Sequence, residues 1–250
     1  MRRRFGRSAK RLESVWQAYG IRSGESALTM TGESSLTAER LEALLAPHCL
    51  EVMGGFAVEG AEEALPPGTR TVVMLGPRQP GFWPHLTAQP EWLDGQADPV
   101  DRWSRRVIGR LACDLQAKAL FPFGGPPYHP FYQWALRTGR CWDSPVRLLV
   151  HDTQGLWVSF RGVLALKQAL DLPGGEKPCG TCAEKPCLSA CPAGALGAAG
   201  YDVPRCHDWL DGEGQECLSG GCLVRRACPV SRGHARMREQ SAYHMGQFHR

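Results

Sequence analysis

The chain has 250 residues, of which 43% are hydrophobic and 22% charged, and a formal net charge of +4. This length allows one domain of about 150–180 residues together with a small appended module. The mild charge does not indicate a nucleic-acid partner, and no run of about 18 apolar residues is present that could span a membrane. The opening MRRRF resembles a twin-arginine export signal but is followed by a charged amphipathic segment. We therefore expect a cytoplasmic protein, in which thiols stay reduced and available for metal.

Residues 1–172 are expected to form an α+β domain. Helical spacing of apolar residues, N-cap and proline signals, and two strongly apolar runs define its elements. In chain order we expect a helix at 8–20, a helix from Thr37 to Ala46, strands at 50–59 and 69–77, a helix from Asp98 to about Ala119, a strand at 119–123 and a helix at 128–139. Residues 78–96 are rich in proline and aromatic residues without periodicity, which predicts a long ordered loop lining a pocket.

The second half of the chain is expected to contain a hairpin, a linker and a small module. Residues 144–166 have the pattern of a hairpin, with a turn at His151–Gly155 between two apolar strands. Proline and glycine then mark a linker, which puts a domain boundary near 171–177. The module is expected to occupy 173–232, and the basic tail at 233–250 is expected to be only partly ordered.

Eight of the eleven cysteines lie between Cys179 and Pro229. The first four have the spacing C-x2-C-x4-C-x3-C-P, which is close to the C-x2-C-x2-C-x3-C-P run of bacterial ferredoxins, and the last cysteine is also followed by proline. In such proteins the cysteine before proline binds the other cluster. We therefore expect two [4Fe-4S] clusters, the first held by Cys179, Cys182, Cys187 and Cys228, and the second by Cys191, Cys206, Cys217 and Cys222.

Three other interpretations of these cysteines remain open. A single cluster would need only four of them. Zinc also takes four cysteines, but its sites usually contain paired C-x2-4-C knuckles, and neither half of this region divides into two such pairs. Disulfides would require an oxidising compartment, for which the sequence gives no sign. Cys49, Cys113 and Cys141 lie outside the motif and are expected to be buried or idle thiols.

Taken together, three stretches resemble the epoxyqueuosine reductases, which are iron–sulfur and cobalamin proteins. They are FPFGGPPYHPF with its Tyr128-His129 pair, the segment LLVHDTQGLWVSFRGVLALKQALDLP, and the eight-cysteine pattern that includes Arg205-Cys206. HDTQGLWVSFRGVLAL is also similar to a strand pair of the cobalamin-trafficking CblC-type proteins. The resemblance implies a nitroreductase/CblC-like sheet flanked by helices, followed by a small bacterial-ferredoxin-like dicluster module. It also implies a corrinoid between the two, for which Tyr128, His129, Gly155 and Trp157 are the candidate binding residues.

The chain departs from that family in two ways that concern its substrate. Pro127 stands where the family has an acidic residue before its Tyr-His pair. The tRNA-reading extension is not matched, because only a short tail follows Pro229. A nucleic-acid substrate is therefore not expected.

Three functions are compatible with these features. The first is a reductase that passes single electrons through two clusters to a corrinoid or a small substrate in the N-domain. The second is a cobalamin-processing protein, and the third is a ferredoxin-type electron carrier without catalysis. Because no GxGxxG or Walker sequence is present, a nucleotide site is not indicated. We therefore expect an external donor such as a flavodoxin or a ferredoxin-type reductase.

Overall fold

The computed structural model describes residues 35–249, and residues Leu36–Arg250 form one compact unit. The expected helix at 8–20 lies outside the described residues. The helices are α2 (Ala38–Leu45), η2 (Ala46–His48), α3 (Phe82–Thr87), α4 (Pro90–Leu93), α5 (Pro99–Asp114), α6 (Phe131–Arg137), η3 (Pro186–Leu188), α7 (Val203–Asp211), α8 (Gln215–Gly220), α9 (Leu223–Ala227), α10 (Pro229–Gly233) and α11 (Arg238–Phe248). The strands are β1 (Leu50–Ala57), β2 (Thr71–Pro77), β3 (Lys118–Leu120), β4 (Cys141–Asp143), β5 (Leu149–His151), β6 (Gly162–Leu166), β7 (Leu196–Gly197) and β8 (Gly200–Tyr201).

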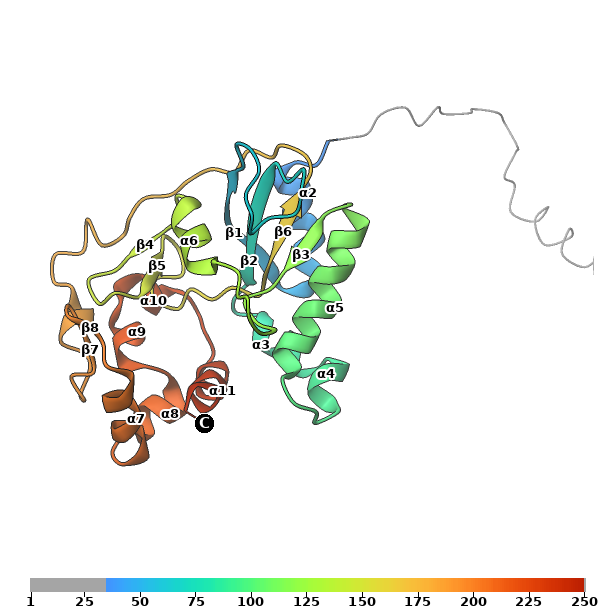
Figure 1. Cartoon of the computed structure of the whole chain (residues 1–250). Coiled ribbons are helices and arrows are strands. Elements are labelled where there is room, and N and C mark those ends of the chain that lie inside the picture. The colour runs from blue at the N-terminus through green and yellow to red at the C-terminus, as the bar shows by residue number, and fades with distance from the viewer. Residues whose placement is uncertain (1–34, 250) are drawn as a thin grey trace, which may run out of the picture. The chain divides into compact units, whose positions relative to one another are not determined.

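An antiparallel sheet with the strand order β1-β2-β6-β3 organises the first part of the chain (Figure 1). The central strands β2 and β6 are buried along their whole length because helices cover both faces of the sheet. Alternate residues of β2 point to opposite faces. Val73 and Leu75 pack with α2, α3 and α5, while Val72 and Met74 pack with α6. The chain thus combines helices with antiparallel sheets, as expected for the α+β class.

Several predicted elements are confirmed with small changes at their ends. Thr37 is the N-cap of α2, where its side-chain oxygen accepts a hydrogen bond of 3.2 Å from the Arg40 amide. α5 begins at Pro99 as expected but ends at Asp114, earlier than the predicted Ala119. Gln116 takes a left-handed backbone conformation (φ 52°), which ends the helix and directs the chain into β3.

The predicted loop at 78–96 is wrong, because this segment contains α3 and α4. The first is only six residues long and the second only four, too short to give a visible helical period. Both are held by packing of their aromatic residues. Phe82 is fully buried against Trp103 of α5, with ring centroids 5.5 Å apart, and Trp83 contacts Trp92 at 4.9 Å.

The predicted hairpin at 144–166 is also wrong in its pairing. His151 and Gly155 do exchange backbone hydrogen bonds of 3.0 Å, so the expected tight turn is present. The strands on either side of it, however, belong to different sheets. β5 pairs with β4, whereas β6 lies between β2 and β3. An apolar pattern identifies a strand but does not identify its partner.

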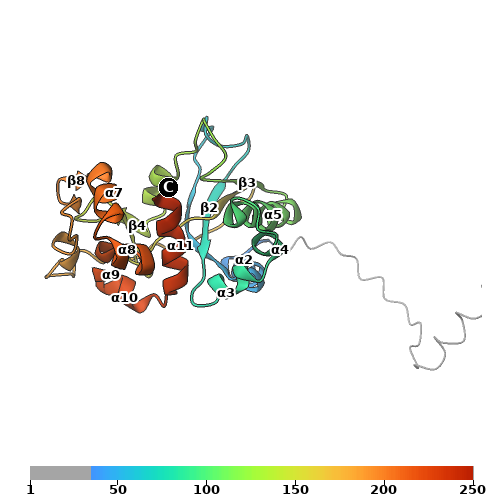
Figure 2. The same cartoon turned by 90° about the horizontal axis from the view of Figure 1, so that it is seen from below.

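The basic tail forms a helix, α11, rather than a partly ordered segment. This helix lies beside α8 (Figure 2), and Gln240 and Ser241 on it are buried. Tyr243 contacts the rings of Trp83 and Trp92, with centroids 5.4 and 5.2 Å apart. Order in this tail therefore comes from tertiary contacts that no local pattern reveals. Within residues 35–249, no helix has the length and apolar character needed to cross a membrane.

These contacts predict that Tyr243→Ala destabilises the protein. Losing two aromatic contacts and the ring's burial should cost about 2 kcal/mol, which corresponds to a fall in Tm of about 4–8 °C. Tyr128→Ala is the matched control, because Tyr128 is 68% exposed. Circular dichroism melting of both variants provides the measurement. Equal Tm values for the two variants would show that α11 is not docked through Tyr243.

Candidate functional site

Two cavities divide the eight motif cysteines into two sets. The large cavity, of about 530 Å³, is lined by the second cysteine set, Cys191, Cys206, Cys217 and Cys222. The small cavity, of about 310 Å³, is lined by the first cysteine set, Cys179, Cys182, Cys187 and Cys228. Each set thus combines a cysteine that precedes proline in one half of the motif with three cysteines of the other half. These two sets are the same as those that the Cys-Pro spacing predicts.

Local backbone geometry explains how the chain crosses between the sets. Cys228 is extended (φ −60°, ψ 125°), and Pro229 then begins α10. A residue before proline is biased toward this extended conformation, so Cys228 separates α9 from α10. Cys222 is the N-cap residue of α9, and Cys217 lies in α8. Cys206 comes from α7.

The thiols interact electrostatically within each set. Burial raises the pKa of Cys179, and thiolates of the first set raise it further, in the order Cys228, Cys187 and Cys182. Burial likewise raises the pKa of Cys217, and its thiol neighbours are Cys222, Cys206 and Cys191, all of the second set. These raised pKa values favour the neutral thiol forms of Cys179 and Cys217, and a bound cation would favour their thiolate forms.

The four thiols of each set line their own cavity. All eleven cysteines are free, and within residues 35–249 no group of three or more His, Cys, Asp or Glu side chains could hold a single metal ion. A zinc ion would bring four sulfurs to about 2.3 Å from one centre. A four-iron cube instead binds each thiolate at a different corner, so its ligands stand farther apart. Four thiols around a void of this kind could hold such a cluster.

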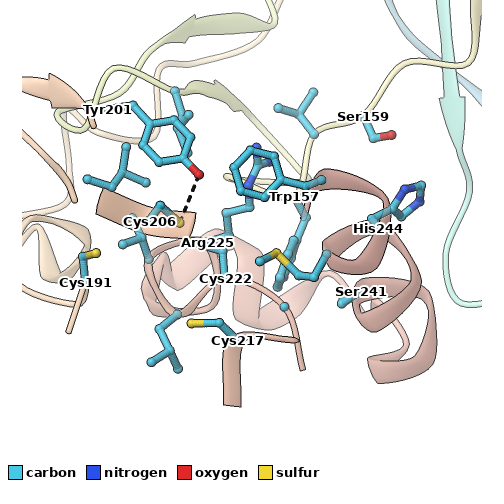
Figure 3. A pocket seen from close by; sticks show the side chains of 18 of the residues that line it. Trp157, Ser159, Cys191, Tyr201, Cys206, Cys217, Cys222, Arg225, Ser241 and His244 are labelled. Carbon is cyan, nitrogen blue, oxygen red and sulfur yellow. Dashed lines mark hydrogen bonds between the residues drawn. The ribbon is translucent and has the colours of Figure 1, made fainter. Parts of the chain in front are cut away.

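Two further groups donate to sulfur in the second set. The Ala195 amide donates to Sγ of Cys191 at 3.3 Å, and the Tyr201 hydroxyl donates to Sγ of Cys206 at 3.4 Å (Figure 3). Hydrogen bonds to ligand sulfurs tune the potential of a metal centre. Tyr201 was missed in the sequence, because its role depends on the β7–β8 turn that brings it back over α7.

The large cavity extends beyond the second cysteine set to the segment before β6 and to α11. Trp157 and Ser159 line it from the segment before β6, and Arg225 and His244 line it from the C-terminal part (Figure 3). Arg236 is a further lining residue from that part. Burial lowers the pKa of His244 to about 2, and nearby arginines act in the same direction. His244 is therefore a neutral imidazole at physiological pH. Most of the remaining wall is apolar, so the cavity combines an apolar interior with a few polar groups.

The four candidate corrinoid-binding residues do not come together. Trp157 lines the large cavity. Tyr128 and His129 line a separate cavity of about 300 Å³, together with Arg105, and the His129 ring stacks on Trp134 at 5.6 Å. Gly155 lines neither cysteine cavity. Of the four, Trp157 alone lines a cysteine cavity.

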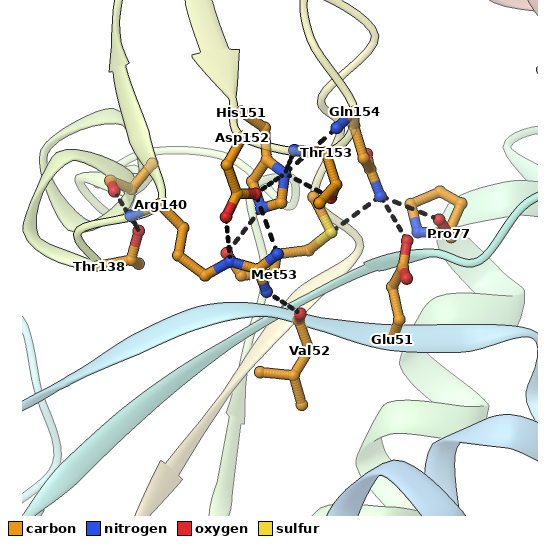
Figure 4. Close-up of polar contacts among 11 residues, drawn as sticks. Glu51, Val52, Met53, Pro77, Thr138, Arg140, His151, Asp152, Thr153 and Gln154 are labelled. Atoms are coloured by element: carbon orange, nitrogen blue, oxygen red, sulfur yellow. Dashed lines mark hydrogen bonds and ion pairs between the residues drawn. The ribbon is translucent and has the colours of Figure 1, made fainter. Parts of the chain in front are cut away.

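A polar network fastens residues 151–154 to β1 (Figure 4). Asp152 accepts hydrogen bonds of 2.8 and 2.9 Å from Arg140, which also donates to the Val52 carbonyl at 3.2 Å. Nε2 of His151 lies 3.2 Å from the Met53 carbonyl. The Gln154 amide donates to Glu51 at 2.6 Å and to the Pro77 carbonyl at 3.3 Å. These contacts hold the segment that carries Trp157.

The same segment is fastened on its other side to the cysteine module. Ser231 Oγ accepts a hydrogen bond of 2.8 Å from the Leu156 amide, and Arg225 donates to the Leu156 carbonyl at 2.6 Å. Gly155 lies so close that a Cβ there would stand 2.5 Å from the Ser231 nitrogen and 3.1 Å from Sγ of Cys228. Residues 155–157 therefore touch both cysteine sets, the first through Cys228 and the second through the large cavity.

Comparison with known proteins does not assign the chain to a family. No protein-family model matches the sequence, and the curated proteins give no significant match.

The close approach at Gly155 predicts that Gly155→Ala is strongly destabilising. Gly155 has φ 58° and a crowded Cβ position, whereas Gly68 has φ 77° and nothing within 4 Å of its Cβ position. Gly68→Ala should therefore cost only the left-handed backbone term of about 1–2 kcal/mol. We expect Gly155→Ala to cost at least about 2 kcal/mol more, measured by thermal melting. Equal losses in the two variants would show that Ser231 does not abut Gly155.

Burial of His151 predicts a pH dependence of stability. Burial lowers the pKa of His151 from 6.5 to about 4, although Asp152 opposes this shift. Below pH 6.5 His151 binds a proton in the unfolded chain but not in the folded chain, so the free energy of unfolding falls as the pH falls toward 4. Between pH 7.5 and 5.5 this should cost about 1 kcal/mol, or about 2–4 °C in Tm. His151→Gln, which keeps a donor near the Met53 carbonyl, should reduce the pH dependence by that amount. An unchanged dependence of Tm on pH in this variant would contradict the prediction.

Proposed function

We propose that this protein binds two [4Fe-4S] clusters, one in each cysteine cavity, and delivers single electrons to a molecule bound at the N-domain end of the large cavity. The observation that carries the proposal is the grouping of the eight thiols around two separate cavities. When bound, such clusters supply one-electron transfer at potentials set by burial, charge and hydrogen bonds. Zinc is disfavoured because neither half of the motif divides into two C-x2-4-C pairs.

The residues around the second cysteine set favour this set, rather than the first, as the one that lies next to the acceptor. Tyr201 and the Ala195 amide donate to its sulfurs, and Arg225 places a positive charge near the Cys222 thiolate. Trp157 and Phe160 provide apolar walls next to it. These side chains would exclude water and hold a small acceptor close to the second set. The first set would then lie on the side of the external donor.

The finer fold assignment is part of the same proposal. The antiparallel sheet flanked by helices is compatible with a nitroreductase/CblC-like domain, and the cysteine region with a dicluster ferredoxin-like module. On this basis we propose a redox protein resembling the epoxyqueuosine reductases. The large cavity supports an acceptor site, which a plain ferredoxin-type carrier would not need.

A corrinoid is the alternative acceptor that the resemblance implies. Cavities of about 300–1,000 Å³ accommodate drug-sized ligands, and the large cavity, of about 530 Å³, must also contain a cluster. A complete corrinoid would therefore have to project through the mouth of the cavity. A smaller organic substrate fits the enclosed volume better.

The cluster proposal predicts about eight irons and eight acid-labile sulfides per chain after anaerobic purification. Cys191→Ser should damage the cluster of the second set, and Cys228→Ser that of the first, so the two variants should lose different signals in the electron paramagnetic resonance spectrum of the reduced protein. Cys113→Ser is the control, because Cys113 lies on α5 outside both sets. Four irons, stoichiometric zinc, or loss of the same signal in both variants would contradict the assignment.

The acceptor proposal predicts that NADPH alone does not reduce the clusters, whereas a flavodoxin with its reductase does. Hydroxocobalamin at high micromolar concentration distinguishes the two acceptors. A shift in its absorption spectrum, weakened in Trp157→Ala while the iron content stays unchanged, would establish the corrinoid in place of a smaller acceptor. No spectral shift and no rise in Tm would leave the smaller acceptor as the proposed ligand.

A further inference from the structure

The large cavity carries positive charge without a carboxylate among its lining residues to balance it. Arginines 147, 225 and 236 line this cavity, and no aspartate or glutamate among residues 35–249 does so. Arg236 makes one hydrogen bond, donated from Nε to Ser241 at 3.0 Å, and its guanidinium lies over the Trp157 ring at 5.1 Å. A guanidinium has five N–H donors. Most of the hydrogen-bonding capacity of Arg236 is therefore not used by the described residues.

The clusters themselves do not account for Arg236. The Cys222 thiolate acts on Arg225, so Arg225 belongs to the surroundings of the second cysteine set. The charged groups that act on Arg236 are instead other cations, Arg225 and Arg161. Burial, followed by these cations, lowers the pKa of Arg236 to about 9, and the group is still charged at neutral pH. Arg161 already has Asp101 as its partner at 3.4 Å, so among the described residues no anion is left for Arg236.

Arg236 also lies where the large cavity meets an open groove. Trp157, Arg236 and Ser241 line both the large cavity and a groove of about 650 Å³. Three more arginines, Arg226, Arg232 and Arg238, line the groove. Such a field attracts small anions from solution and raises their local concentration. The lining of the large cavity itself is mostly apolar.

We infer that the acceptor is an organic anion with an apolar, planar body, whose carboxylate or phosphate pairs with Arg236 at the junction of the groove and the large cavity. This inference rests on the proposed function, because the body of the ligand would lie between Trp157 and the second cysteine set. The planar guanidinium fork of arginine suits bidentate binding of either anion. Ser241 holds the fork by its Nε, which leaves the terminal nitrogens for the ligand.

Binding of small aromatic probes to the anaerobically purified, cluster-loaded chain tests the inference. Benzoate and phenyl phosphate are the probes, and benzamide is the neutral control of matched shape. Isothermal titration calorimetry should detect binding of at least one of the anions and a dissociation constant for benzamide at least 10-fold weaker. The dissociation constants of benzoate and phenyl phosphate then show whether the site prefers a carboxylate or a phosphate. Equal binding of benzamide, or binding of none of the three, would overturn the inference.

Two arginine variants locate the site. Arg236→Gln should weaken anion binding about 10- to 100-fold, as expected for the loss of charge-assisted hydrogen bonds. Arg238→Gln, in the same groove but bonded to Ser219, should change it less than about 3-fold. Equal losses of anion affinity in both variants would indicate binding to a diffuse basic surface and would contradict a specific site at Arg236. Should Arg236→Gln fail to fold, Arg236→Lys takes its place. This variant keeps the charge but loses the planar fork, so it should bind the anions more weakly than the unchanged protein does and should lack the preference for an anion that accepts two hydrogen bonds.

The iron content of the same samples separates this inference from the proposed function. Eight irons without anion binding would refute the inference and leave the two-cluster proposal standing. Anion binding that depends on Arg236 in a chain without iron would refute the clusters and leave an anion site.

Discussion

The contact of residues 155–157 with the cysteine module is the constraint on which the proposed site depends. A glycine is required at Gly155, because any side chain would meet the Ser231 backbone, and the Leu156 amide and carbonyl are both bonded across the same contact. The polar network of Arg140, Asp152 and Gln154 fixes the other end of this segment to the sheet. Trp157 is thereby held beside the second cysteine set.

The division of the cysteines follows from the same arrangement. In each half of the motif the chain changes set just before the Cys-Pro step, between Cys187 and Cys191 and again between Cys222 and Cys228. The short stretch from Cys222 to Cys228 therefore connects the two cavities. Arg225 lies within this stretch and faces the Leu156 carbonyl. The two proposed clusters, followed by a cavity with an apolar wall and an excess of positive charge, would suit the reduction of a bound anion better than the simple storage of electrons.

The sequence predicted what depends on short-range spacing and missed what depends on long-range contacts. Cysteine spacing predicted two sets of cluster ligands, and each of these sets lines one cavity. N-cap and apolar signals predicted α2, β1, β2 and most of α5. The partner of β6 was missed, because apolar strands do not encode their neighbours. α11 was missed because its order comes from Tyr243 packing against distant tryptophans. His244 lies on that helix and Arg236 lies just before it, so no sequence motif indicated that either residue lines the cavity.

The central claim is that each cysteine set holds its own four-iron cluster. Anomalous diffraction from anaerobically grown crystals, measured at the iron absorption edge, tests it most directly. The account predicts two separate groups of iron peaks, one inside the large cavity among Cys191, Cys206, Cys217 and Cys222, and one inside the small cavity beside Cys228. A single group of peaks, or peaks at the zinc edge instead, would contradict it.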